Sequence, residues 1–204
     1  MPFNVSTAAR QYWAALRVLL VLTVVLGILY PLAVAAVGQL ALRNQANGSM
    51  VSAGGHVVGS SLIGQNFTDA KGNPLPQWFQ PRPSAAGANG YDPTSSSASN
   101  LGPNNSDLLK QVQDRRAAVA ALAGVDPASV PPDALTASGS GLDPDISPAY
   151  AYLQVDRVAK ARGLDPAQVK SLVTAHVDGR ALGFLGEPTV NVLDLNLALL
   201  GMQG

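Results

Sequence analysis

The sequence predicts a single N-terminal transmembrane helix followed by an α+β, helix-rich extracytoplasmic domain. Residues 18–37 are 20 consecutive positions without a charged side chain, which is the length a helix needs to cross a bilayer. Residues 44–204 instead combine short apolar runs with turn residues and repeated helix start and stop signals. Arg10 and Arg17 precede the apolar run and only Arg43 follows it closely, so the positive-inside rule places the N-terminus in the cytoplasm.

The apolar run allows two interpretations. As a permanent anchor it spans about 30 Å as a helix, with Tyr12 and Trp13 at the headgroup level and a tolerable kink at Pro31. As a cleavable signal peptide it offers Ala33–Ala35 as a small-residue cleavage site. The run is longer than the roughly 7–15 residues of a typical signal-peptide core, which favours the anchor. We discount a buried core helix, because such a helix seldom lacks a polar face over this length.

These assignments divide the chain into a cytoplasmic N-terminus (1–17), the transmembrane helix (18–37) and a soluble domain (44–204). The 13 basic and 13 acidic side chains give a formal net charge of zero, which argues against binding to nucleic acid. The absence of cysteine excludes disulfides and thiol chemistry. Two separated histidines, His56 and His176, offer little material for a metal site.

The first half of the domain is poor in regular structure. Short apolar runs within 50–66, bounded by glycine and asparagine, predict brief strands. In residues 84–106, 15 of 23 are Ser, Gly, Asn or Pro. Such a segment buries too little surface to offset its ordering entropy, so we expect a loop that is either a mobile linker or functional.

The second half carries the punctuation of helices. Ser106 is placed to cap a helix over 107–123, and further helices are expected at 148–162 and 166–178. A Gly-x-Asp-Pro element begins at Gly124, Gly141 and Gly163; glycine ends one helix, aspartate caps the next and proline occupies its first position. A strand near 189–192 and a helix over 193–200 complete the expected elements.

No catalytic motif stands out. There is no phosphate-binding Gly-x-x-x-x-Gly-Lys-Ser/Thr loop, and Ser140 lies in Gly-Ser-Gly without a nearby histidine. Asp143 and Asp145 alone fall short of a calcium loop. Arg157, Lys160 and Arg162 predict a solvated basic helix face.

Several segments together resemble the C chain of the Kdp high-affinity potassium-transporting P-type ATPase of bacteria. Their order and spacing cover essentially the whole chain. The segments are Gln45–Ser49, Gly59–Phe67, Trp78–Ala85, Ser99–Pro103, Leu135–Pro148, Gln154, Arg157–Arg162, Leu182–Pro188 and Val190–Leu199.

The resemblance implies an accessory, non-pore subunit of an ATP-driven potassium uptake complex in the bacterial inner membrane. Its partners would be a potassium channel-like chain, a P-type ATPase chain and a small chain, together with membrane lipid. The subunit would stabilise the assembly and raise the ATP affinity of the ATPase chain. It would bind no cofactor firmly by itself, with ATP acting through the ATPase chain. The sequence has neither a Thr-Val-Gly-Tyr-Gly filter nor an Asp-Lys-Thr-Gly phosphorylation motif, which agrees with a non-catalytic role.

Within this interpretation we expect no catalytic residue and no metal ligand. The candidates for contact with a nucleotide or a partner are Gln154, Arg82, Ser138, Ser140 and Asp143. Each also has a structural interpretation. Helix capping accounts for Asp143 and for Asn191, and Gln154 could be a buried amide with satisfied partners.

Two other functions remain open from the sequence. The chain could be a membrane-tethered extracytoplasmic binding or structural protein without a pump partner. It could also be a secreted hydrolase that uses Ser140 or Asp143.

Overall fold

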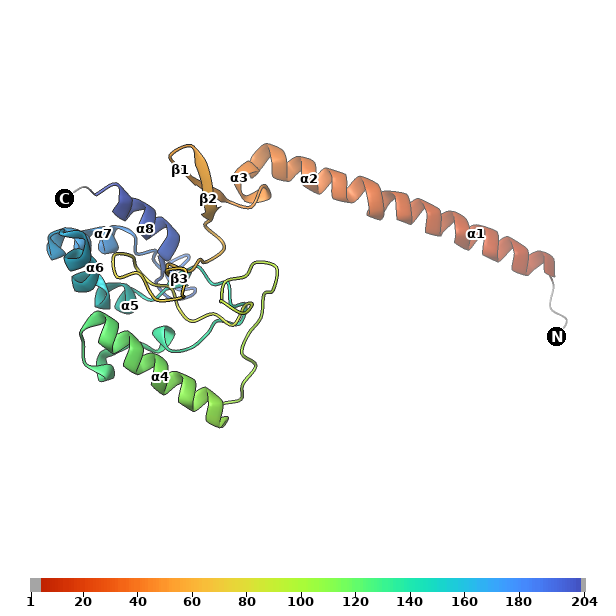
Figure 1. Cartoon of the computed structure of the whole chain (residues 1–204). Helices are drawn as coiled ribbons and strands as arrows, with labels where there is room; N and C mark the ends of the chain where they lie inside the picture. The colour runs from red at the N-terminus through yellow and green to blue at the C-terminus, as the bar shows by residue number, and fades with distance from the viewer. Residues whose placement is uncertain (1–4, 203–204) are drawn as a thin grey trace. The chain divides into compact units, whose positions relative to one another are not determined.

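The structure of the protein is a computed structural model that describes residues 5–202. The chain divides into two compact units, Met1–Ser49 and Met50–Gly204, which we describe separately (Figure 1). The first contains the predicted transmembrane segment and the second the helix-rich α+β domain.

The N-terminal unit is one long helical stretch followed by a short helix. It is built from α1 (Val5–Val24), η1 (Val25–Leu29), α2 (Tyr30–Ala41) and α3 (Arg43–Ala46). Within residues 5–202, one helix is long and apolar enough to cross a membrane; it covers Ala8–Ala41, with 34 residues and a mean hydropathy of 2.7. At about 1.5 Å per residue it reaches about 50 Å, so it extends beyond the predicted 18–37 at both ends.

Pro31 does not end the helix; the hydrogen-bond pattern before it changes from α-helical to π-helical. Proline has no N–H and its ring clashes with the carbonyl of the preceding turn. The preceding turn widens to a π-helix over Val25–Leu29, and the Tyr30 N–H donates to the Val25 carbonyl, five residues back. A π-turn of this kind absorbs the proline without interrupting the helix.

The domain is rich in helices and contains two small antiparallel sheets. One sheet pairs β1 with β2, and the other pairs β3 with β4, in the register Asp145 to Asn191 and Ile146 to Val190. Its elements are β1 (Met50–Ala53), β2 (His56–Ser60), α4 (Ser106–Ala123), η2 (Pro127–Ser129), η3 (Pro132–Ala134), β3 (Asp145–Ile146), α5 (Pro148–Leu153), α6 (Val155–Arg162), α7 (Pro166–Ala175), β4 (Val190–Asn191) and α8 (Val192–Leu200). This confirms the predicted helix-rich α+β class.

The predicted helix boundaries hold closely, with three differences, of which the first is that α7 ends at Ala175 rather than at residue 178. Gly163 ends α6 in the left-handed conformation (φ 67°), and Asp165 caps α7. Asn105 rather than Ser106 caps α4, accepting hydrogen bonds from the backbone N–H groups of residues 107 and 108. The single helix expected over 148–162 is two helices, which meet at Gln154.

The core is formed where α5, α6, α7 and α8 meet. In Figure 1, α6, α7 and α8 lie together, and α4 packs across α6. Several of its side chains have no exposed surface: Phe79, Ala151, Val158, Ala159, Val169, Val173, Val190, Leu195 and Leu199. Phe79 belongs to none of these helices, so a segment outside the helices contributes to the core.

Residues 84–105 contain neither helix nor strand, but they are tied to the domain. The Ser84 hydroxyl donates to the Gly141 carbonyl and accepts from the Tyr91 N–H. The Ser97 N–H donates to the Ser140 carbonyl. Ala86 has no exposed surface, so the loop packs against residues 138–143 instead of forming a free linker.

Candidate functional site

The segment Pro76–Gln80 turns at Pro76 and Gln77 near the surface and enters the interior of the domain at Phe79 and Gln80, without a neighbouring β-strand. We call it the core segment. Buried backbone N–H and C=O groups need hydrogen-bond partners, and side chains supply them here. The partners come from α6, from α8 and from the residue between α5 and α6.

Gln154 replaces a strand neighbour for Gln80. Its side-chain oxygen accepts from the Gln80 N–H at 2.7 Å, and its NH₂ group donates to the Gln80 carbonyl at 3.1 Å. The same oxygen accepts from the Arg157 guanidinium at 2.6 Å. Gln154 is 2% exposed, so the structure places this candidate contact residue in the core, as a buried amide with satisfied partners.

Asn196 of α8 does the same for the adjacent residue. Its side-chain oxygen accepts from the Phe79 N–H at 2.9 Å, and its NH₂ group donates to the Phe79 carbonyl at 3.0 Å. Asn196 is buried. Two amides therefore hold two consecutive residues of the core segment.

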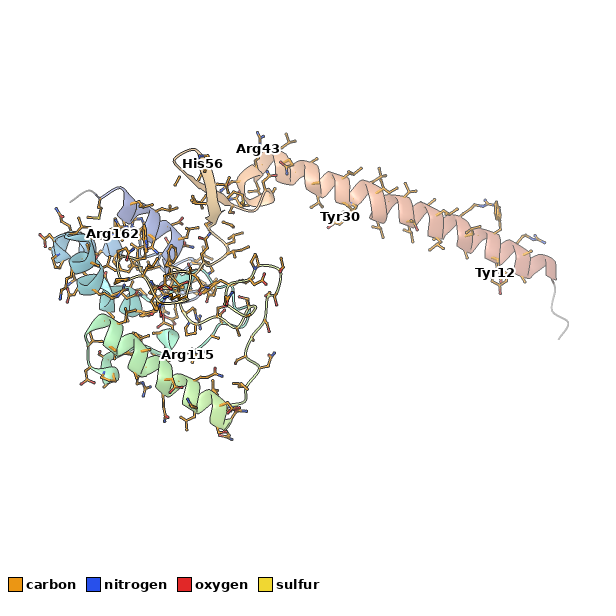
Figure 2. The ribbon with its side chains drawn as sticks, viewed as in Figure 1. Tyr12, Tyr30, Arg43, His56, Arg115 and Arg162 are labelled. Atoms are coloured by element: carbon orange, nitrogen blue, oxygen red, sulfur yellow. The ribbon has the colours of Figure 1, made fainter. Side chains whose placement is uncertain are left out.

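Two arginines of α6 complete the pattern. Arg157 donates to the carbonyls of Pro76 and Trp78, and Arg162 donates to the Gln77 carbonyl at 2.9 Å. The Arg162 guanidinium also lies 4.3 Å from the centre of the Trp78 ring. Figure 2 shows Arg162 among the helices of the domain.

The predicted solvated basic face of α6 is therefore wrong for Arg157, and Arg162 is only partly exposed. Arg157 is buried, and burial lowers its pKa to about 10. Only Lys160 of the predicted face is exposed. The sequence does not show that these arginine side chains bind backbone carbonyls, because those carbonyls lie about 80 positions earlier in the chain.

The other four candidate residues gather at a pocket on the surface of the domain. Arg82, Ser138, Ser140 and Asp143 line an open pocket of about 580 Å³ together with Leu62, Ile63, Ala137, Gly139, Leu142 and Pro144. A guanidinium nitrogen of Arg82 lies 2.7 Å from a carboxylate oxygen of Asp143. Both side chains are partly buried, at 23% and 29% exposure. We call this site the Arg82–Asp143 pocket.

The serine hydroxyls hold the wall of this pocket. The Ser138 hydroxyl accepts from the Gly141 N–H at 2.8 Å, and the Ser140 hydroxyl accepts from the Leu142 N–H at 3.1 Å. Gly141 has φ 68°, and an added Cβ there would lie 2.5 Å from the Ser97 carbonyl oxygen. Only glycine fits this position, where the loop 84–105 meets the pocket wall.

Asp143 differs from its predicted role as a helix cap. No helix starts after it, because β3 follows within two residues. Its carboxylate instead accepts from the Asp145 N–H at 3.1 Å and pairs with Arg82. Burial, with a smaller effect of the nearby Asp143 carboxylate, raises the pKa of Asp145. Asn191 caps α8 as predicted, accepting from the Asp194 N–H.

The side chains of Arg82, Ser138 and Ser140 form hydrogen bonds within the domain that hold the pocket wall in place. Among the residues that line it there is no histidine, and no three His, Asp or Glu side chains within residues 5–202 could together hold a metal ion. The arrangement is an open surface pocket with one internally paired charge. Such a surface suits contact with another macromolecule by shape.

Comparison with protein families shows to which family the chain belongs. The model described as K+-transporting ATPase, c chain, matches residues 12–200. The chain belongs to this family. The match includes most of the apolar helix and all of the Arg82–Asp143 pocket.

Individual relatives agree with the family assignment. A protein of Kineococcus radiotolerans is 60% identical over 98% of this chain and 97% of its own length. Proteins of Streptomyces avermitilis (53% identical, 96% of each chain) and Mycobacterium tuberculosis (54% identical, 93% of this chain and 97% of that protein) are similar to it as well. Each of the three is named as the KdpC subunit of a potassium-transporting ATPase.

Proposed function

We propose that the chain is the accessory, non-pore subunit of an ATP-driven potassium uptake complex and that it raises the ATP affinity of the ATPase chain. The observation that carries this proposal is the family match over residues 12–200. Its partners in the proposal are a channel-like chain, a P-type ATPase chain and a small chain.

The proposed orientation places the N-terminus in the cytoplasm and residues 44–204 outside the inner membrane. Arg10 and Arg17 lie before the apolar core of the helix, while Arg43 follows it. Basic residues are retained on the cytoplasmic side. The exposed apolar surface of Ala8–Ala41 supports a permanent anchor in lipid.

In this orientation the domain cannot touch cytoplasmic ATP. The effect on ATP affinity then requires two states of the ATPase that the subunit binds unequally. The chain itself would hold no cofactor, and ATP would be bound by the ATPase chain. The Arg82–Asp143 pocket would contact a partner chain rather than a nucleotide, with Gln154 supporting the fold behind it.

The orientation is tested by labelling engineered cysteines, for which the cysteine-free chain is well suited. A membrane-impermeant maleimide should label Ser95→Cys in intact cells and label Ala9→Cys only after lysis. Both positions are exposed. The reverse pattern would overturn the orientation.

The function is tested in the purified complex. A tagged copy of the chain should bring down a P-type ATPase chain, whereas a membrane-tethered protein without a pump partner would not. Removing the chain from the complex should raise the ATP concentration for half-maximal ATPase activity at least about fivefold, the lower range of typical coupling between sites. An unchanged ATP dependence would leave an assembly role and refute the effect on affinity.

A further inference from the structure

Two arginines and a tryptophan lie on one face of α1, near the N-terminal end of the apolar helix. Arg10, Trp13 and Arg17 are spaced three and four residues apart, the spacing that brings side chains to the same face of a helix. All three side chains are exposed. The Arg17 guanidinium lies 5.4 Å from the centre of the Trp13 ring. We call these three residues the arginine face.

The length of the helix places the arginine face at the headgroups of a bilayer. The helix Ala8–Ala41 has 34 residues and reaches about 50 Å, whereas the hydrocarbon core is about 30 Å thick. The uncharged run begins directly after Arg17, at Val18. Arg17 therefore lies at the edge of the hydrocarbon, and Arg10 lies about 10 Å further out along the axis. Each headgroup layer is about 5–8 Å thick, so the lipid phosphates lie between the two arginines.

The direction of the Arg17 side chain favours contact with these phosphates. Side chains of a helix lean toward its N-terminus, which for Arg17 is the direction out of the hydrocarbon. Its position beside the ring of Trp13, one turn nearer the N-terminus, agrees with this direction. An arginine can keep its aliphatic stem in the apolar layer while its guanidinium reaches the interface. Trp13 has the amphipathic ring that is typical of the headgroup level.

The N-terminal unit offers no carboxylate to pair with Arg17. The first acidic residue of the chain is Asp69, which lies beyond the unit Met1–Ser49. A charge at the edge of the hydrocarbon needs a counter-ion close by, and a guanidinium binds phosphate oxygens through two parallel hydrogen bonds. The anion present at this depth is the phosphate of a lipid headgroup. Anionic lipids attract arginines next to the membrane, whereas a zwitterionic headgroup carries a cation of its own.

We propose that Arg10, Trp13 and Arg17 form a binding site for the headgroup of an anionic phospholipid, in the leaflet nearest the N-terminus. Arg17 holds the phosphate from the hydrocarbon side and Arg10 from the aqueous side. The Trp13 ring positions the Arg17 guanidinium through a cation–π contact. This inference rests on the membrane anchor of the proposed function but not on its orientation, because lipid surrounds the helix in either orientation.

Quenching of Trp13 by brominated lipids tests the proposal in the full-length chain. The chain contains two tryptophans, Trp13 and Trp78, so Trp78→Phe leaves Trp13 as the only reporter. This variant is reconstituted in phosphatidylcholine vesicles that contain equal amounts of either brominated phosphatidylglycerol or brominated phosphatidylcholine. One basic residue next to an anionic surface gives roughly a fivefold preference, so we expect an association constant at least about fivefold higher for the brominated phosphatidylglycerol.

The result separates the lipid site from the proposed function. Equal association constants, from a chain that floats with the vesicles, would overturn the site and leave the proposed function intact. A chain that does not float with the vesicles would refute the membrane anchor and the site together.

Moving one charge around the helix distinguishes a site from a general attraction. Arg17→Gln should lower the preference for the anionic lipid about fivefold. Adding Ala15→Arg restores the net charge at nearly the same depth, but about 200° around the helix from residue 17, where it does not face the same lipid as Arg10 and Trp13. The double variant should therefore stay as low as Arg17→Gln. Recovery of the preference in the double variant would show a general attraction and refute the site.

Two controls check the position of the site and the source of the phosphate. Arg43 is exposed and follows the opposite end of the helix, so Arg43→Gln should keep the full preference, and an equal loss in this variant would refute the site. Inorganic phosphate, compared with chloride at the same ionic strength, should leave the preference unchanged. A selective loss in phosphate would show a site for soluble anions and overturn the assignment to lipid.

A second measurement needs no change at Trp78. The wild-type chain and Arg17→Gln are extracted in mild detergent from vesicles of mixed phosphatidylglycerol and phosphatidylcholine, and mass spectrometry measures the lipid that stays bound. The wild type should retain about fivefold more phosphatidylglycerol per chain than the variant. Equal amounts on the two proteins would refute the proposal.

Discussion

The side chain of Gln154 hydrogen-bonds both backbone groups of Gln80, which lies 74 residues earlier in the chain. In a sheet these two groups would bind a neighbouring strand. Here a single amide provides the donor and the acceptor that the strand would offer. The core segment can therefore enter a helical core without leaving the backbone groups of Phe79 and Gln80 unpaired.

Gln154→Ala should destabilise the domain strongly. The substitution leaves the Gln80 N–H and carbonyl without partners and removes one contact of Arg157. We expect a loss of about 3 kcal/mol in the free energy of unfolding and a fall in Tm of about 6–12 °C. Circular dichroism of the full-length chain in detergent measures both. The control Gln168→Ala, at an exposed position of α7, should change Tm by less than about 2 °C, and a similar loss in the two variants would contradict the assigned role.

Asn196→Ala should be coupled to Gln154→Ala. Each amide holds one of two consecutive residues, Phe79 and Gln80. Once one amide is lost the segment can shift, so the second loss costs less than it does alone. We expect the double variant to fall short of the sum of the single losses by at least about 0.5 kcal/mol. Simple additivity in urea unfolding would show that the two residues are held independently.

Asp143→Asn should weaken the domain through the ion pair with Arg82. The neutral side chain keeps an oxygen for the Asp145 N–H but loses the charge that attracts the guanidinium. We expect a loss of about 1–2 kcal/mol that shrinks as the salt concentration rises. The matched control is Asp114→Asn, since the pair of Asp114 with Lys110 is largely exposed and should contribute less than about 0.5 kcal/mol. Losses of equal size in both variants would argue against a special role of the pocket pair.

Asp145→Asn should stabilise the domain at neutral pH. Burial raises the pKa of Asp145 in the fold, so the folded state binds more protons than the unfolded state between the unfolded and folded pKa values. The carboxylate therefore imposes a cost on the fold above its folded pKa, and this cost disappears as the pH falls toward the unfolded value. Asn removes the cost, so Tm should rise at pH 7 and converge with the wild type near pH 3.

The control for this pH profile is Asp156→Asn. Asp156 is an exposed residue in the first turn of α6, where a negative charge favours the helix dipole. Its replacement should bring no gain at pH 7. A gain in this variant, or a gain for Asp145→Asn that persists at low pH, would show that the effect does not come from titration of Asp145.

Local signals in the sequence predicted several of these features well. Gly163 and Asp165 mark the end of α6 and the start of α7 as expected, and Asn191 caps α8. The cap of α4 was predicted one residue late, because Ser106 and Asn105 are both good capping residues and the sequence does not decide between them. The four residues of the Arg82–Asp143 pocket were singled out by their motifs, but the pairing of Arg82 with Asp143 was not predicted.

By itself the sequence determined the apolar helix, the helix-rich class and most helix ends. All of these depend on hydropathy or capping within a few residues, which the local chain contains in full. Only the tertiary structure decided how the core segment is held and which side chains become structural. The partners of Gln154 and Asn196 lie 74 and 117 positions away, and polar groups so distant are brought together only by the packing of the helices around them.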